Sequence, residues 1–269
     1  MTQFWLTDLA YESTCHEVLA REAGEVLGER GVVRITGFPD SAAVLISFLG
    51  HLGTPLGYYG GDAGTHPDHN AIWRVAYDRD ASQRGETHAI AGPLAVHSSQ
   101  SLLDPRPRYF CMLMANPGWQ DLEPGMNGES LLVPWSRTLR LLAEENPDEY
   151  GKLLDTLMSP VPYPDGLTRP LVYELNPMRE RFDYGVRLKS DLLTTLKAAF
   201  PDEDVTHLME KFAAAGQRAA KRVQLAAGDL VVVDNDRWGH GRESVIGRRR
   251  AADGSWTVNP RELWSLTLA

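Results

Sequence analysis

Apolar residues recur at helical spacing in the first thirty residues of the chain. Thr14 and Glu17 have the spacing of a capping box before this apolar run, and Gly31 follows it, so we predict a helix that ends at Gly31. The segment GVVRITGF then predicts a strand. Asp40 stands before a second apolar helical run and is the residue we expect to cap it.

The middle of the chain alternates between strand patterns and helical patterns. Residues 57–95 are rich in Gly, His, Asp and Asn and contain one clear strand, IWRVAYD, so we expect long loops there. Apolar runs bounded by Pro or Gly predict two further strands, at residues 107–115 and 129–133. Helical periodicity predicts helices at about residues 136–158, 190–199 and 203–222.

Strand patterns return near the C-terminus. Gly228 and Asp229 predict a hairpin turn into LVVVDN, and ELWSLTL predicts a final strand. We therefore expect a mainly β fold with a helical insertion around residues 136–222. Because no repeat or linker marks a boundary, we expect one domain over residues 1–269, and the absence of GxGxxG and GxxxxGK[ST] loops disfavours a nucleotide-binding fold.

Composition and charge disfavour some classes of binding partner. The chain has 43% hydrophobic residues and a net charge of −9, from 27 basic and 36 acidic residues. This charge disfavours nucleic acid and anionic membrane surfaces. There is no signal-peptide pattern and no apolar run long enough to cross a bilayer. The two cysteines, Cys15 and Cys111, are too few for a disulfide framework and suit a reducing cytoplasm.

Two of the eight histidines differ from the rest in their context. His97 closes the strand-like segment GPLAVH, and His240 follows LVVVDNDRWG, so each stands at the end of a β segment. The mouth of a barrel lies at such strand ends. The other six lie in helical or loop segments without partner spacing that suggests a metal.

The segments around these histidines resemble one family. LAVHSSQSLLDPRPRYF, NGESLLVP, GDLVVVDNDRWGHGRES and RELW, within residues 94–269, are similar to the iron(II)/2-oxoglutarate-dependent dioxygenases of the clavaminate-synthase and taurine-dioxygenase superfamily. The resemblance implies a double-stranded β-helix, a cupin-like jelly-roll flanked by helices. It implies an enzyme that oxidises a small molecule with iron(II), 2-oxoglutarate and O2 as cofactors.

The resemblance also implies site residues. His97 and His240 correspond to the two histidine ligands of the iron, a metal that imidazole suits. Ser130 corresponds to the hydroxyl residue that binds 2-oxoglutarate. Arg261 corresponds to the arginine that clamps its far carboxylate, which a guanidinium fork matches bidentately; some relatives place this arginine at the position of Ser265.

Ser99 departs from the family, which has an acidic metal ligand at this position. Three explanations stay open. Gln100 or a water completes the metal shell, and the protein is an oxygenase with unusual coordination that performs hydroxylation, desaturation or cyclisation. Alternatively, the small side chain of Ser99 leaves room for a halide and the protein is a radical halogenase. In the third explanation, the protein is a non-catalytic binding relative.

The sequence says less about the residues that contact the substrate than about those that bind the metal and 2-oxoglutarate. Because relatives in this family act on amino acids, we expect Arg181 or Arg242 to hold a substrate carboxylate and Asp183 to hold an ammonium group. Tyr58 and Trp73, in the loop-rich segment, are further candidates for substrate contact. A homodimer stays open.

Overall fold

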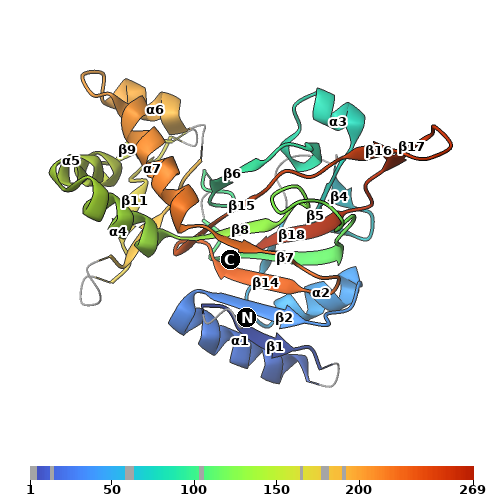
Figure 1. Ribbon diagram of the computed structural model, residues 1–269. Coiled ribbons are helices and arrows are strands. Elements are labelled where there is room, and N and C mark those ends of the chain that lie inside the picture. Colours follow the sequence, from blue (N-terminus) through green and yellow to red (C-terminus); the bar gives the residue numbers. More distant parts are fainter. Residues whose placement is uncertain are drawn as a thin grey trace.

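The computed structural model describes residues 5–12, 15–57, 64–102, 106–163, 166–176, 182–189 and 192–269. A large sheet has the strand order β1-β2-β14-β7-β18-β5-β4, with β3 paired to β18 (Figure 1). Its strands are β1 (Thr7–Ala10), β2 (Val32–Thr36), β3 (Pro55–Leu56), β4 (Thr65–His66), β5 (His69–Ala76), β7 (Tyr109–Asn116), β14 (Leu230–Asp234) and β18 (Glu262–Leu268). A smaller sheet has the order β13-β8-β15-β6, built from β6 (Leu94–His97), β8 (Ser130–Pro134), β13 (Lys221–Val223) and β15 (Trp238–Arg242).

Three short hairpins and the helices complete the described fold. The hairpins pair β9 (Val161–Pro162) with β10 (Thr168–Arg169), β11 (Val172–Glu174) with β12 (Tyr184–Val186), and β16 (Arg248–Arg250) with β17 (Trp256–Val258). The helices are α1 (His16–Arg30), α2 (Ala42–Leu49), α3 (Arg79–Gln83), the 3-10 helix η1 (Thr87–Ala89), α4 (Trp135–Glu145), α5 (Pro147–Met158), α6 (Leu192–Ala199) and α7 (Val205–Ala219). These elements confirm the expected β-rich fold with helices.

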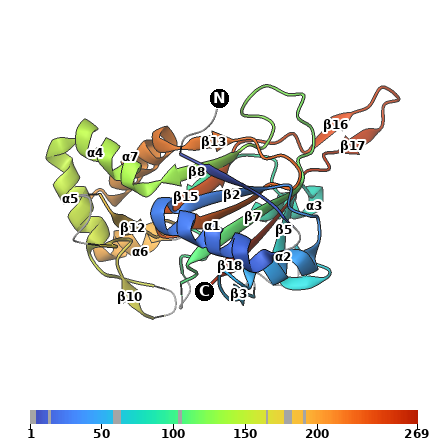
Figure 2. The ribbon, with the colours of Figure 1, turned by 90° about the horizontal axis from the view of Figure 1, so that it is seen from below.

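Alternation of side chains along each strand divides the core into layers. On β14, Leu230 and Val232 pack against α1 and α2, which cover one face of the large sheet (Figure 2). Val231 and Val233 pack in a separate cluster between the two sheets, together with Phe110 of β7 and other inward residues. Apolar side chains therefore pack on both faces of the large sheet, against the N-terminal helices on one face and toward the small sheet on the other.

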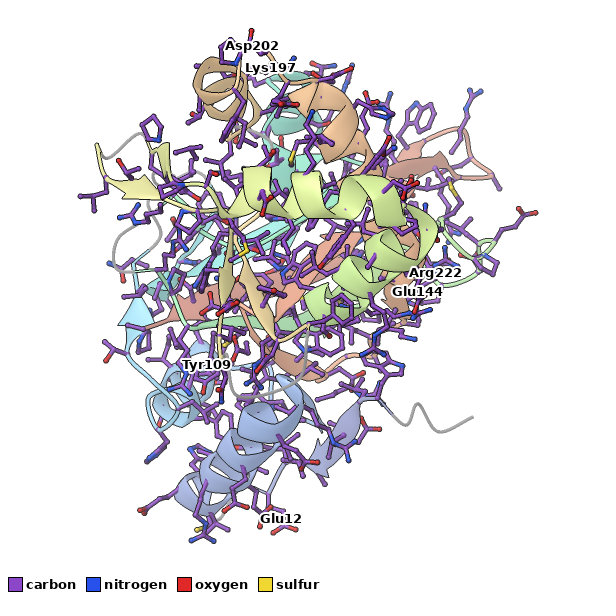
Figure 3. The ribbon with its side chains drawn as sticks, turned by 90° about the vertical axis from the view of Figure 1, so that its left-hand side faces the viewer. Glu12, Tyr109, Glu144, Lys197, Asp202 and Arg222 are labelled. Atoms are coloured by element: carbon purple, nitrogen blue, oxygen red, sulfur yellow. The ribbon has the colours of Figure 1, made fainter. Side chains whose placement is uncertain are left out.

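The helical insertion covers the outer face of the small sheet. Figure 3 looks at the protein from this side, with the helices of the insertion in front of the strands. The single helix expected at residues 136–158 is two helices, because the chain breaks at Asn146 and Pro147 begins α5. The last expected helix ends at Ala219, since residues 221–223 join the small sheet as β13.

The N-terminal helix ends where the sequence predicts. Gly31 has φ 72°, and its N–H donates to the carbonyl of Leu27 at 2.8 Å. This left-handed conformation favours glycine, which has no Cβ to clash with the helix end. Thr14, one member of the expected capping box, lies outside the described residues.

Two expectations from the sequence are wrong: the residue that caps α2, and the hairpin before β14. Ser41 rather than Asp40 caps α2, because the Ser41 hydroxyl accepts from the backbone N–H of Val44 at 3.4 Å. Gly228 and Asp229 do form a turn before β14, but the turn does not make a hairpin. The preceding strand, β13, pairs with β8 in the small sheet, and β14 pairs with β2 and β7 in the large one. This turn therefore carries the chain from one sheet to the other.

Among the described residues, no helix combines the length and the apolar character needed to span a membrane.

A close contact fixes the small sheet against the insertion. A Cβ at Gly239 of β15 would lie 2.2 Å from the ring of Trp135, which is fully buried at the start of α4. Real Cβ atoms do not approach this closely, so a glycine is required for Trp135 to lie against the strand that carries His240.

We predict that Gly239→Ala lowers the free energy of unfolding by about 1–3 kcal/mol, because the added methyl group overpacks the Trp135 contact. Gly151→Ala is the matched control: Gly151 lies within α5 with open space around its Cβ position. That change should raise stability by about 0.5–1 kcal/mol through helix propensity. Urea unfolding of both variants measures the difference, and equal effects at the two glycines would contradict this reading of Gly239.

Candidate active site

His97 and His240 face one another across the small sheet. Strands β6 and β15 pair antiparallel with His97 directly opposite His240, and the two ring centroids lie 4.4 Å apart. Nδ1 of His97 donates to the carbonyl of Ala95 at 2.9 Å, the arrangement that leaves Nε2 with a free lone pair. The large sheet closes on this pair from the other side, since Phe110 of β7 stacks on His240 at 3.8 Å between centroids.

The cavity next to the histidines lies between the two sheets. Side chains two residues apart on a strand lie on the same face of the sheet, so several strands each contribute a pair of side chains to the cavity wall. The lining residues are Trp73, Val75, Thr87, His88, Leu94, His97, Ser99, Phe110, Met112, Ser130, His240, Gly241, Arg242, Arg261, Leu263 and Ser265. The structure thus brings together His97, His240, Ser99, Ser130, Arg242 and Arg261, which the sequence predicts as site residues far apart in the chain.

Two buried arginines give the cavity positive charge. Arg261, just before β18, is 4% exposed and donates from Nη2 to the carbonyl of Gly128 at 3.0 Å. Burial first, and then the charge of Arg242, lower the pKa of Arg261 to about 9. Arg242 of β15 is 5% exposed, and burial lowers its pKa to about 10. Both guanidinium groups therefore stay charged near neutral pH.

The segment after His97 is held by Asn235. The side chain of Asn235 accepts from the backbone N–H of Ser99 and donates to its carbonyl, each at 2.9 Å. Asn235 is fully buried in the turn between β14 and β15, the DND segment of the sequence. These two bonds place Ser99 at the cavity wall.

Gln100 is directed away from the histidine cavity. It has φ 47°, a left-handed conformation that few residues other than glycine adopt. Its side-chain carbonyl accepts from the hydroxyl of Thr267 at 2.9 Å, and it does not line the cavity. The expectation that Gln100 takes part in metal binding is therefore not supported by its side-chain contact.

Of the other described residues predicted to contact substrate, Trp73 lines this cavity and Asp183 does not. Asp183 lines a different cavity, with Arg30, Arg237 and Trp238, and its Oδ2 is buried without a hydrogen-bond partner among the described residues. Arg181 and Tyr58 lie outside the described residues. Contact of these three residues with substrate stays a prediction.

Sequence reasoning missed two residues at the site. His88, assigned to a polar loop, lines the cavity from η1 and packs edge-on against Trp73 with 4.8 Å between ring centroids. The sequence pattern indicates only that Phe110 is a core residue of a strand, but in the structure its ring stacks on His240. No spacing in the sequence marks either residue, because their positions depend on the pairing of distant strands.

The described residues fit a metal ion held by two imidazoles. Burial lowers the pKa of His97; burial, followed by the neighbouring His97, lowers the pKa of His240 well below its usual value. Neutral imidazole is the form that binds metals. Nδ1 of His240 is buried and makes no hydrogen bond in the described part of the chain. No cluster of three His, Cys, Asp or Glu side chains that could hold a metal occurs among the described residues.

The family assignment agrees with this geometry. The model of the taurine catabolism dioxygenase TauD, TfdA family matches residues 6–256. The chain therefore belongs to this family and is an enzyme of the iron(II)/2-oxoglutarate-dependent dioxygenase class, as the motifs around the two histidines predicted. No curated protein matches the chain significantly.

Several solved structures share the fold. Asparagine oxygenase in complex with Fe(II), 2S,3S-3-hydroxyasparagine and succinate aligns with a TM-score of 0.63 and 14% identity, covering 97% of this chain and 93% of that one. The iron oxygenase OrfP in complex with Fe, succinate and (3S)-hydroxy-L-Arg aligns with a TM-score of 0.61 and 16% identity, covering 96% and 81%. PvcB from Pseudomonas aeruginosa aligns with a TM-score of 0.62 and 15% identity, covering 97% of this chain and 84% of that one. At these identities the likeness is one of fold.

We predict that stability falls as the pH drops below about 6.5, the ordinary pKa of histidine. His97 and His240 resist protonation in the folded chain, so the unfolded chain binds more protons below this pH and unfolding becomes easier. Each such histidine adds a slope approaching about 1.4 kcal/mol per pH unit. Urea unfolding of the metal-free protein between pH 8 and 5 should show a shallower slope for His240→Gln than for wild type. Identical slopes would count against a neutral, buried His240.

Proposed function

We propose that the protein is an iron(II)/2-oxoglutarate-dependent oxygenase that oxidises a small, amino-acid-like molecule by hydroxylation, desaturation or cyclisation. The observation that carries the proposal is the facing pair His97 and His240 in a cavity that also contains Ser130 and two buried arginines. The two sheets that enclose this cavity support the double-stranded β-helix, or jelly-roll, expected for the family.

In this proposal His97 and His240 hold the iron. Iron(II) with 2-oxoglutarate supplies the chemistry, in which O2 is consumed and the bound substrate is oxidised. Arg261 binds the far carboxylate of 2-oxoglutarate, and its buried position supports this role because a desolvated guanidinium pairs strongly with a carboxylate. Ser130, buried on β8, adds a hydroxyl donor to the same cavity.

The apolar part of the lining orients the substrate and excludes water. Trp73, Phe110, Met112 and Leu263 surround the histidines with apolar surface. Such a lining replaces bulk water, which would otherwise react with the oxidising species. The solved relatives bound to hydroxylated asparagine and arginine support an amino-acid-like substrate here.

A second candidate function is halogenation. Ser99 lines the cavity with a small side chain at the position where the family has an acidic ligand, and Asn235 holds its backbone in place. Water at this position gives an oxygenase with unusual coordination, and a halide gives a halogenase. The family assignment favours either enzyme over a non-catalytic relative.

We predict that Arg261→Met weakens binding of 2-oxoglutarate by about 10- to 100-fold, because a charge-assisted pair worth about 1.5–3 kcal/mol is lost. Arg222→Met is the matched control, since Arg222 is an exposed arginine on β13, labelled in Figure 3, and its side chain is not part of the cavity lining. Anaerobic calorimetric titration of the iron(II) protein with 2-oxoglutarate measures both. Unchanged affinity in Arg261→Met would remove Arg261 from the clamp role.

We predict that Ser99→Asp raises the affinity for iron(II) at least about tenfold, since a carboxylate adds charge and a ligand at the vacated position. Ser136→Asp adds the same charge on the exposed side of α4 and should leave iron affinity unchanged.

A halide-free assay separates the two candidate functions. In buffer without chloride and bromide, wild-type consumption of 2-oxoglutarate should continue if water occupies the ligand position next to Ser99. A strict halide requirement would instead establish the halogenase.

A further inference from the structure

A buried ion pair lies outside the lining of the histidine cavity. Arg187, which directly follows β12, is 2% exposed, and its Nη2 pairs with Oδ1 of Asp236 in the turn between β14 and β15. The hydroxyl of Tyr173 donates to the same carboxylate oxygen at 2.5 Å. Arg187 also donates to the carbonyl of Pro107 at 3.2 Å. The pair thus joins segments that are far apart in the sequence.

The backbone on either side of Arg187 holds the residue next to His97. The hydroxyl of Ser98 donates to the carbonyl of Val186 at 2.8 Å, and the N–H of Ser98 donates to the carbonyl of Leu188 at 2.9 Å. Ser98 is fully buried, so water does not compete for these bonds. A shift of Arg187 would therefore move the strand end that carries His97.

Asp236 holds the turn that leads to His240. Its backbone carbonyl accepts from the N–H of Val186 at 2.9 Å, and its own N–H donates to the carboxylate of Asp234 at 3.0 Å. His240 lies four residues further along the chain, within β15. Through Arg187 and Asp236, the segment of one imidazole is therefore tied to the segment of the other.

We infer that Arg187 and Asp236 are positioning residues of the metal site: their ion pair sets the spacing between the segments that carry His97 and His240. The inference rests on the proposed function, because it takes these two imidazoles as the metal ligands. Ligands that share one metal ion must be placed to within a few tenths of an ångström, so the two segments need a fixed spacing.

Stability alone does not account for this pair. A buried ion pair is often no more stabilising than apolar side chains of the same size, because both charges lose their hydration. Nη1 of Arg187 is also buried with no acceptor in the described chain, so the arginine is not fully satisfied by its partners. What the pair provides that apolar side chains would not is a defined direction between the two segments.

The test measures cobalt(II) binding to the full-length protein, because the visible bands of cobalt(II) depend on the geometry of its ligands. Arg187→Met and Asp236→Asn should each weaken binding at least about tenfold and shift these bands, as loss of the support behind a metal ligand does. The two changes remove opposite charges, so a purely electrostatic effect on the cation would have opposite signs in the two variants. The double variant should bind like either single variant, because the two side chains act as one unit.

Leu45→Ala is the control for lost stability alone. Leu45 is fully buried on α2, which packs on the opposite face of the large sheet, and its truncation leaves a cavity in that layer. This variant should unfold at lower urea concentration yet bind cobalt(II) as wild type does. Equal weakening in Leu45→Ala and in the variants of the ion pair would overturn the positioning role, and so would effects of opposite sign in Arg187→Met and Asp236→Asn.

The outcomes also separate this inference from the function on which it rests. If wild type does not bind cobalt(II), or if His97→Ala and His240→Ala bind it as wild type does, the proposed metal site is contradicted. If these two variants lose binding while Arg187→Met and Asp236→Asn keep it, only the positioning role is overturned.

A single variant leaves one buried charge unpaired and can fail to fold for that reason. In that case the double variant and Tyr173→Phe decide. The double variant should bind cobalt(II) at least about tenfold more weakly than wild type. Tyr173→Phe, which removes only a hydroxyl donor to Asp236, should weaken binding about two- to tenfold. Wild-type affinity and unchanged visible bands in these variants would contradict the inference.

Discussion

The antiparallel register of β6 and β15 is the constraint on which the site depends. It places His97 directly opposite His240, and a shift of one residue would turn either ring to the other face of the sheet. The close approach of Trp135 to Gly239 fixes β15 against the helical insertion, and the stacking of Phe110 on His240 fixes it against the large sheet. The two rings are thus held by contacts on both faces of the small sheet.

Burial then sets the chemistry of the groups in the cavity. It keeps the histidines neutral and able to bind a metal, while the arginines stay charged and attract carboxylates. The lining of the cavity thus combines neutral imidazoles with positively charged guanidinium groups. A keto acid that chelates a metal with one end and pairs with a guanidinium at the other suits this arrangement.

Much of the site could be predicted from the sequence because its residues lie in motifs next to recognisable strands. His97, Ser130 and Arg261 each lie at or beside the end of a strand, His240 lies within β15, and the structure brings all four to one cavity. The placement of other residues depends on pairing between distant segments. The turn at residues 228–229 was expected to form a hairpin because local turn chemistry does not say which sheet each flanking strand joins. For the same reason nothing in the sequence brings His88 to the cavity or separates Asp183 from it.

The most direct test of the central claim is X-ray absorption spectroscopy at the iron edge of the protein loaded anaerobically with iron(II) and 2-oxoglutarate. The account predicts scattering from two imidazole ligands in wild type and from one in either His97→Ala or His240→Ala. An iron shell without imidazole, or one that is the same in wild type and both variants, would contradict it.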